Sequence, residues 1–142
     1  ASAIDQLFTL TLPDPSGQPQ ALGQWRGRPL ILNFWATWCA PCVEEMPELQ
    51  RLHDVYSPKG AHVLGLAVDR GEAVAEFARK LAIRYPLLIA GASGADLARA
   101  LGNAAGGLPF TLAIRADGQL HASHVGKIRY EQAREWLDQL TT

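Results

Sequence analysis

The two cysteines of the sequence, Cys39 and Cys42, lie two residues apart in the run Trp-Cys-Ala-Pro-Cys. An apolar run at residues 30–36 precedes them, as is typical of a strand buried on both faces. From residue 41 onward apolar residues recur at helical spacing. The thiols are therefore predicted to lie where a central strand ends and a helix begins. Two thiols held this closely can interconvert with a disulfide, so the predicted chemistry is thiol–disulfide exchange.

The first cysteine is predicted to be the attacking nucleophile. Unpaired N–H groups and the macrodipole make a helix N-terminus partly positive, and thiols in such motifs have a pKa of roughly 3.5–7.5 instead of about 8.5. We expect Cys39 to be exposed and acidic, and Cys42, deeper in the helix and facing inward, to resolve the mixed disulfide. Pro41 suits the first helical turn because it needs no N–H there. The Ala40–Pro41 dipeptide is expected to tune the reduction potential.

Two other uses of a cysteine pair are less consistent with the sequence. A structural zinc site needs four ligands, typically a second pair of Cys or His residues at close spacing. His121 and His124 are three apart on an expected strand and so point to opposite faces, which leaves no predicted metal site. A purely structural disulfide would stabilise little, because so short a loop removes little chain entropy.

Glu45 is the carboxylate expected to act beside the thiols. At about 100° per residue it lies within roughly 60° of Cys42 on the expected helix, whereas Glu44 and Glu48 point toward water. Desolvation would raise the pKa of Glu45 and let it exchange a proton with Cys42 near neutral pH. The alternative is a solvated glutamate at the helix edge.

The run Phe-Trp-Ala-Thr-Trp-Cys-Ala-Pro-Cys at residues 34–42 resembles the active-site run of thioredoxin-fold proteins. Its extension through Val-Glu-Glu-Met-Pro at residues 43–47 is similar to the TlpA/ResA/DsbE-like branch of that family. The resemblance covers nearly the whole chain. It implies an active-site glutamate three residues after the second cysteine, the place that Glu45 occupies. Asn33 departs from thioredoxins proper, which carry a buried Asp at this strand position, and this departure makes Glu45 the better proton acceptor.

The resemblance also assigns a role to the Gly-Gly-Leu-Pro segment at residues 106–109. Taken alone, this segment would be a plain turn. Thioredoxin-fold proteins place a cis-proline facing the cysteines just before such a strand, and Pro109 matches it. The resemblance therefore implies that the backbone of Leu108 pairs with an extended substrate segment beside Cys39. Trp38, Ala40, Leu108 and Pro109 are expected to form a shallow apolar surface around the exposed sulfur, and Pro41 is also expected to contact the substrate.

The remaining pattern predicts an α/β fold with a central, mostly parallel sheet and flanking helices. The expected strands are at residues 8–12 and 20–22, forming an N-terminal β-hairpin, and at residues 30–36, 62–68, 86–90, 111–114 and 120–125. Helices are expected after Cys42, at residues 74–81, after a capping Ser93, and at residues 133–140. The resemblance identifies the helix and strand before residue 106 as the central insertion of a thioredoxin fold. Residues 1–142 are expected to form a single thioredoxin-like domain.

Composition narrows the possible functions. The chain is 48% hydrophobic and 19% charged, as is ordinary for a globular protein. Its net charge of −1 does not indicate the basic surface that binds nucleic acid. No apolar run approaches the roughly eighteen residues that cross a bilayer, and the N-terminus lacks the features of a signal peptide. The chain is therefore a cytosolic protein or a domain without its targeting segment. The resemblance implies the second: a periplasmic monomer, anchored to the inner membrane by an N-terminal segment absent from this chain.

The predicted function is that of a thiol–disulfide oxidoreductase without a cofactor. The resemblance implies a reductant in the cell envelope, acting on a disulfide-bearing substrate protein in cytochrome c maturation or related thiol reduction, with re-reduction by a membrane electron donor. An oxidant would use the same residues at a different potential. A copper-delivery module using the two thiols and a thiol peroxidase are further alternatives, although no His lies close to the thiols and no Arg lies close to Cys39.

Overall fold

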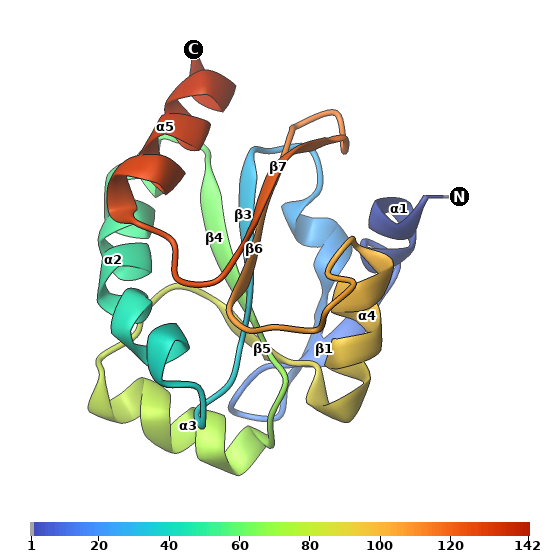
Figure 1. Ribbon diagram of the computed structural model, residues 1–142, viewed down its shortest axis with the longest axis vertical. Helices are drawn as coiled ribbons and strands as arrows, with labels where there is room; N and C mark the ends of the chain where they lie inside the picture. The colour runs from blue at the N-terminus through green and yellow to red at the C-terminus, as the bar shows by residue number, and fades with distance from the viewer. Residues whose placement is uncertain (1) are drawn as a thin grey trace.

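The computed structural model describes residues 2–142 and contains a central sheet with the strand order β5-β4-β3-β6-β7 (Figure 1). The strands are β3 (Leu30–Trp35), β4 (His62–Ala67), β5 (Leu87–Ile89), β6 (Phe110–Ile114) and β7 (Leu120–Val125). β3 pairs parallel with β4 and β4 with β5, whereas β6 is antiparallel to both β3 and β7. Within the described chain only β6 runs against the other four strands of this sheet, so the expectation of a mostly parallel sheet is confirmed.

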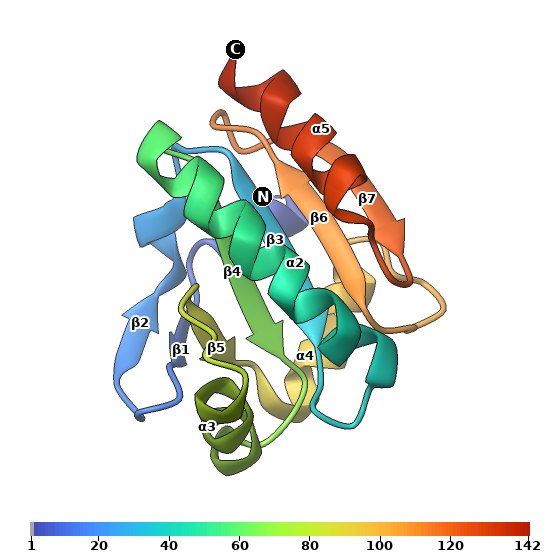
Figure 2. The ribbon, with the colours of Figure 1, turned by 90° about the vertical axis from the view of Figure 1, so that its left-hand side faces the viewer.

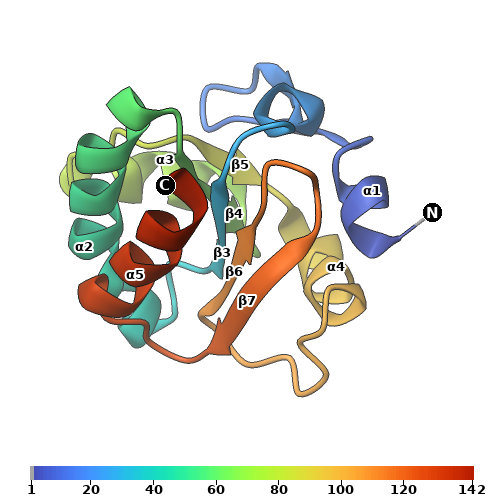
Figure 3. The ribbon, with the colours of Figure 1, turned by 90° about the horizontal axis from the view of Figure 1, so that it is seen from above.

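Helices cover both faces of this sheet (Figures 1 and 3). One face carries α2 (Ala40–Tyr56), α3 (Gly71–Lys80) and α5 (Tyr130–Thr141), and the other carries α1 (Ala3–Leu7) and α4 (Gly94–Ala100). Figure 2 shows α2 and α5 side by side in front of the strands. This layered arrangement confirms the predicted α/β class. Among the helices of residues 2–142, none has both the length and the apolar character needed to span a membrane.

The central strand β3 builds a core on each face of the sheet. All six of its residues are buried, as predicted for a strand covered on both sides. Because side chains alternate along a strand, Ile31 and Trp35 pack in the core beneath α2, while Leu32 and Phe34 pack in the core beneath α4. Asn33 shares the α2 face with Ile31 and Trp35, which places a buried polar group under that helix.

The N-terminal segment differs from its prediction. The β-hairpin is present, formed by β1 (Thr11–Pro13) and β2 (Pro19–Ala21), but the strand expected from residue 8 begins only at Thr11. α1 precedes it, capped by the Ser2 hydroxyl, which accepts from the N–H of Asp5 at 3.1 Å. Phe8 ends this helix and is buried in the core beneath α4, so burial and the capped turn outweigh the alternating pattern.

The helix-and-strand unit expected in the middle of the chain is present as α3 and β5, and Ser93 is the N-cap residue of α4, as predicted, although its side chain does not make the expected capping hydrogen bond. The hydroxyl of Ser93 donates to the backbone oxygen of Ala90 at 2.9 Å and makes no capping hydrogen bond to the helix. The reason is that residues Gly91–Ser93 form a 3-10 turn, which brings the Ser93 hydroxyl within reach of that oxygen.

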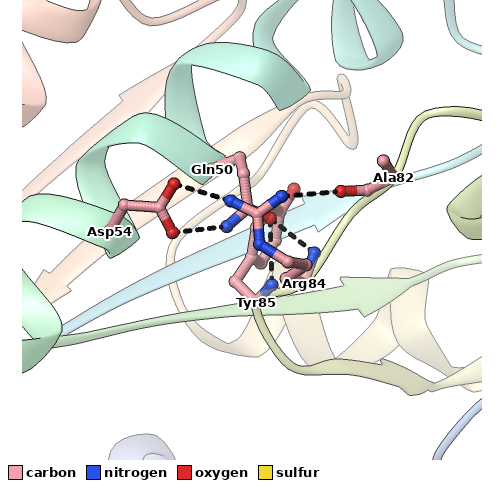
Figure 4. A network of polar contacts seen from close by, with 5 residues as sticks. All are labelled: Gln50, Asp54, Ala82, Arg84 and Tyr85. Atoms are coloured by element: carbon pink, nitrogen blue, oxygen red, sulfur yellow. Dashed lines mark hydrogen bonds and ion pairs between the residues drawn. The ribbon is translucent and has the colours of Figure 1, made fainter.

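A polar network fixes α2 to the segment that leads into β5 (Figure 4). The Oε1 atom of Gln50 accepts hydrogen bonds from the backbone N–H groups of Arg84 and, at 3.1 Å, Tyr85. The Arg84 guanidinium donates to Asp54 at 2.8 Å. Gln50 is buried, whereas the ion pair between Arg84 and Asp54 is exposed. The network therefore combines buried hydrogen bonds with an ion pair on the surface.

Candidate active site

The cysteines lie at the junction that the sequence predicts. β3 ends at Trp35, α2 begins at Ala40, and Cys39 is the N-cap residue of α2. Cys39 and Cys42 form a disulfide, with their Cα atoms 5.3 Å apart. The backbone N–H of Cys42 donates to the Sγ of Cys39 at 3.3 Å. After reduction, the same N–H and the positive end of the helix dipole would favour the Cys39 thiolate over its thiol.

The two sulfurs differ in accessibility, but less than predicted. Cys42 is fully buried and Cys39 is 7% exposed, so the expectation that Cys39 is exposed is wrong in degree. The capping position turns the Cys39 side chain over the first turn of α2, and this residue joins the core cluster that contains Trp35 and Met46. Of the two residues, only Cys39 therefore presents any surface to a partner.

The residues expected to contact the substrate differ in how far they are exposed to solvent. Trp38 is 70% exposed and Ala40 and Pro41 are also exposed, whereas Leu108 is half-buried and Pro109 is buried. The Leu108–Pro109 peptide bond is cis, as predicted.

Strand pairing places the proline at the disulfide end of the sheet. Phe110 pairs with Phe34, so Pro109 lies at the end of the sheet where β3 leads toward Cys39. The N–H of Gly126 donates to the backbone oxygen of Pro109 at 2.8 Å and so links this loop to the end of β7.

Glu45 is buried on the Cys42 face of α2, which confirms its predicted placement. Its Oε1 accepts from the side-chain amide of Asn33 at 2.7 Å, and its Oε2 accepts from the backbone N–H of Ile128 at 3.0 Å. Burial raises the pKa of Glu45 to about 7, against the opposing effect of these two hydrogen bonds. Near neutral pH the carboxyl group can therefore either take up or release a proton.

Asn33 holds this carboxylate without adding a charge. The same amide nitrogen donates to the Thr111 hydroxyl on β6 at 3.0 Å, so Asn33 joins α2 to two strands. An aspartate at this position would place a second carboxylate against Glu45 in the core, and the two charges would repel each other. The substitution of Asn for Asp is therefore consistent with Glu45 as the titrating group.

Asp69 is a positioning residue that the sequence reasoning missed. Its Oδ2 accepts from the N–H of Thr37 at 2.9 Å and from the Thr37 hydroxyl, and its Oδ1 accepts from the N–H of Arg70 at 2.7 Å. Burial alone would raise the pKa of Asp69, but these hydrogen bonds outweigh it and lower the pKa. The loop that carries Trp38 and Cys39 is thereby tied to the end of β4.

A signal for Asp69 existed in the sequence. The residue follows an expected parallel strand, and the carboxyl ends of neighbouring parallel strands meet at one edge of the sheet. The contact from Ile128 to Glu45 had no such signal, because a backbone N–H can come from any residue type except proline.

Comparison with known proteins places this site in a family. The sequence model of the Redoxin family matches residues 3–138. The thiol-disulfide oxidoreductase ResA of Geobacillus kaustophilus is 33% identical over 138 residues, which cover 94% of this chain and 74% of that protein. The ResA of Bacillus thuringiensis subsp. konkukian is 31% identical over 129 residues, covering 90% of this chain and 72% of the relative.

Solved structures share the fold at lower identity. A thiol:disulfide interchange protein of the thioredoxin family from Chlorobium tepidum superposes with a TM-score of 0.80 at 24% identity, covering 94% of this chain and 93% of that one. A secreted disulfide oxidoreductase of Mycobacterium tuberculosis, homologous to DsbE, has a TM-score of 0.80 at 20% identity, covering 96% and 99%. These likenesses confirm the thioredoxin fold and, with the ResA relatives, the TlpA/ResA/DsbE-like branch.

Proposed function

The chain belongs to the Redoxin family and is a thiol–disulfide oxidoreductase, and we propose that it reduces disulfides of substrate proteins in the cell envelope. The observation that carries thiol–disulfide exchange is the asymmetry of the cysteine pair, whereas the reducing direction is inferred from the likeness of residues 34–47 to the TlpA/ResA/DsbE-like branch. Cys39 caps α2 and receives the N–H of Cys42, while Cys42 is fully buried behind it. One sulfur is thus suited to attack a partner and the other to finish the exchange internally.

The proposed reaction has two steps. The Cys39 thiolate attacks one sulfur of the substrate disulfide, the substrate S–S bond breaks, and its other sulfur leaves as a thiolate with the bonding electron pair. Cys42, having passed its proton to Glu45, then attacks the Cys39 sulfur. The Cys39–Cys42 disulfide forms, the second substrate thiolate is released, and the substrate has gained the two electrons that the cysteine pair has lost.

Glu45 fits the role of proton acceptor in the second step. It lies one helical turn beyond Cys42, both residues are fully buried, and burial brings the pKa of Glu45 to about 7. A base with a pKa near the working pH accepts and returns a proton with little thermodynamic cost. Pro109 and the backbone of Leu108 are proposed to align the extended substrate segment beside Cys39, with Trp38, Ala40 and Pro41 as the exposed contact surface.

Each turnover consumes the dithiol, so the protein needs an electron donor. We propose that the protein is a monomer tethered to the inner membrane and facing the periplasm. The likeness of residues 34–47 to the TlpA/ResA/DsbE-like branch supports this proposal. A membrane electron donor would restore the dithiol. The proposed substrates are cysteine pairs of apocytochrome c or of a copper site, which must be reduced before their thiols can form covalent bonds to heme or bind copper.

The reduction potential of the Cys39–Cys42 couple tests the direction of electron flow. Equilibration with glutathione or dithiothreitol buffers, followed by alkylation and mass measurement, gives this value. A potential near −270 mV, like that of thioredoxin, would support the reductant role. A potential near −120 mV, like that of DsbA, would reverse the proposed direction and make the protein an oxidant.

A further inference from the structure

A small cleft of about 160 Å³ is lined by Trp38, the residue that precedes Cys39. Trp38 and Leu108 form its side toward the active site, Val68 follows β4, Ala95 and Ala98 come from α4, and Asn103 comes from the loop after α4. Helix α4 therefore forms one wall of the cleft, and the loops that carry Trp38 and Leu108 form the other.

We propose that this cleft is a subsite that receives one uncharged, apolar side chain of the substrate polypeptide, from a residue flanking the cysteine that Cys39 attacks. The inference rests on the proposed function and adds to it a side-chain preference. Pairing with the backbone of Leu108 would accept any sequence, whereas a pocket of fixed size and lining discriminates among side chains.

The volume and the lining fit such an occupant. An apolar cavity of about 150 Å³ in a protein interior accommodates benzene, so a cleft of about 160 Å³ has room for one aliphatic or aromatic side chain. It is smaller than the roughly 300–1,000 Å³ of ordinary cofactor and ligand sites. Its walls are mostly methyl groups and an indole ring, and a charged side chain would lose its hydration there without gaining an ionic partner.

The position of the cleft indicates that its occupant belongs to the substrate. Trp38 directly precedes Cys39 and Leu108 directly precedes Pro109, so the cleft is continuous with the surface proposed to contact the substrate. A polypeptide whose sulfur reaches Cys39 must pass over this surface. The side chain that enters the cleft therefore comes from the neighbourhood of the substrate cysteine.

Hydrogen bonds of Asn103 fix the position of the loop that follows α4 and lines the cleft. Asn103 is 1% exposed, its amide nitrogen donates to the backbone oxygen of Gly107 at 2.7 Å, and its backbone N–H donates to the oxygen of Ala98 at 3.0 Å. These bonds join α4 to the loop before Pro109. The loop that lines the cleft is therefore held in place by hydrogen bonds within the protein.

Peptide disulfides of varied sequence test the subsite. Each peptide carries one cysteine as a mixed disulfide with 5-thio-2-nitrobenzoate, flanked by Gly, Leu, Phe, Glu or Lys, and reaction with the reduced protein releases the yellow thiolate. We expect the second-order rate constants for the Leu and Phe peptides to exceed that for the Gly peptide by about tenfold, as one well-filled apolar pocket can achieve. The Glu and Lys peptides should react no faster than the Gly peptide.

Two substitutions on α4 provide a matched pair. Ala95→Phe fills the cleft and should bring the ratio of Leu-peptide to Gly-peptide rates close to one, and Ala95→Leu, a milder change, should lower it in the same direction. Ala100→Phe adds the same ring at an exposed position of α4 outside the cleft and should keep the ratio of the unsubstituted protein.

The outcomes separate the subsite from the proposed function. Equal rates for all peptides, or an unchanged ratio in both Ala95 variants, would overturn the subsite while leaving thiol–disulfide exchange intact. If no peptide disulfide reacted with the reduced protein, the proposed function itself would fail, and the subsite with it.

Discussion

The side-chain amide of Asn33 donates a 2.7 Å hydrogen bond to the carboxyl group of Glu45, and both residues are fully buried. This contact joins the central strand β3 to the helix that carries the disulfide. A neutral donor stabilises the ionised carboxylate only in part, and burial still holds the pKa of Glu45 near neutrality, at about 7. The pair therefore places a titrating group one helical turn from Cys42 without a second charge in the core.

Glu45→Gln should remove a pH dependence from the stability of the oxidised protein. The pKa of Glu45 is about 7 in the folded state, whereas that of an unperturbed glutamate is 4.5, so the folded state binds this proton more tightly than the unfolded state. Below pH about 4.5 the carboxyl group is protonated in both states and does not reduce the folding stability. Above pH about 7 it is ionised in both states and reduces the folding stability by its full amount. Relative to Glu45→Gln, the unsubstituted protein should lose about 3 kcal/mol of stability across this window.

Urea unfolding of both proteins between pH 4 and pH 8.5 measures this difference. The disulfide stays intact in these experiments, so that no cysteine titrates. If the two stability curves ran parallel through the window, Glu45 would not have the raised pKa that its proposed catalytic role requires.

Asn33→Leu should raise the pKa of Glu45 further. The substitution keeps the approximate volume but removes the amide that donates to the ionised carboxylate, so the protonated form gains relative stability. Carbon-13 NMR of the labelled glutamate carboxyl groups follows this titration directly. A pKa that stayed at its original value or fell would show that the hydrogen bond has little influence on the charge.

Asp69→Ala should loosen the loop that carries Trp38 and Cys39. Thr37 loses the acceptor for both its N–H and its hydroxyl, and we expect a destabilisation of about 1–3 kcal/mol together with slower attack by Cys39. Asp96→Ala, which removes an exposed ion pair with Arg99, should change stability by less than about 1 kcal/mol and serves as the control. Equal effects of the two substitutions would contradict a positioning role for Asp69.

Gln50→Ala should destabilise the protein more than Arg84→Ala does. Gln50 is buried and satisfies two backbone N–H groups, so its removal should cost about 2 kcal/mol. The pair between Arg84 and Asp54 is exposed and should contribute less than about 1 kcal/mol. Thermal and urea unfolding of the two variants measure both losses of stability. A larger loss for Arg84→Ala than for Gln50→Ala would show that the surface ion pair contributes more to holding α2 than the buried hydrogen bonds do.

The local pattern around the cysteines was sufficient to predict most of the site. The apolar run before the thiols and the helical spacing after them placed Cys39 and Cys42 correctly at a strand–helix junction, and the same spacing placed Glu45 on the inner face. The cis bond at Pro109 followed from a family resemblance, because the segment Gly-Gly-Leu-Pro by itself is an ordinary turn signal.

Features that depend on tertiary contacts were not predictable. The exposure of Cys39 was overestimated, because the sequence does not reveal how tightly the first turn of α2 packs against the core. Glu45 accepts a hydrogen bond from the N–H of Ile128, and Asp69 accepts one from the N–H of Thr37. Each of these bonds joins residues far apart in the chain. Phe8 was assigned to a strand from its alternation with polar neighbours, although the capped turn at Ser2 and the burial of Phe8 favour a helix end.

The division of labour between the two cysteines can be tested most directly by trapping the mixed disulfide. Cys42→Ser and Cys39→Ser variants, each reduced and then mixed with a disulfide-bearing peptide, are analysed by mass spectrometry under non-reducing conditions. The account predicts a long-lived covalent adduct through Cys39 in the Cys42→Ser protein and almost none in the Cys39→Ser protein. An adduct that forms equally fast through Cys42, or rapid turnover by the Cys42→Ser protein, would contradict it.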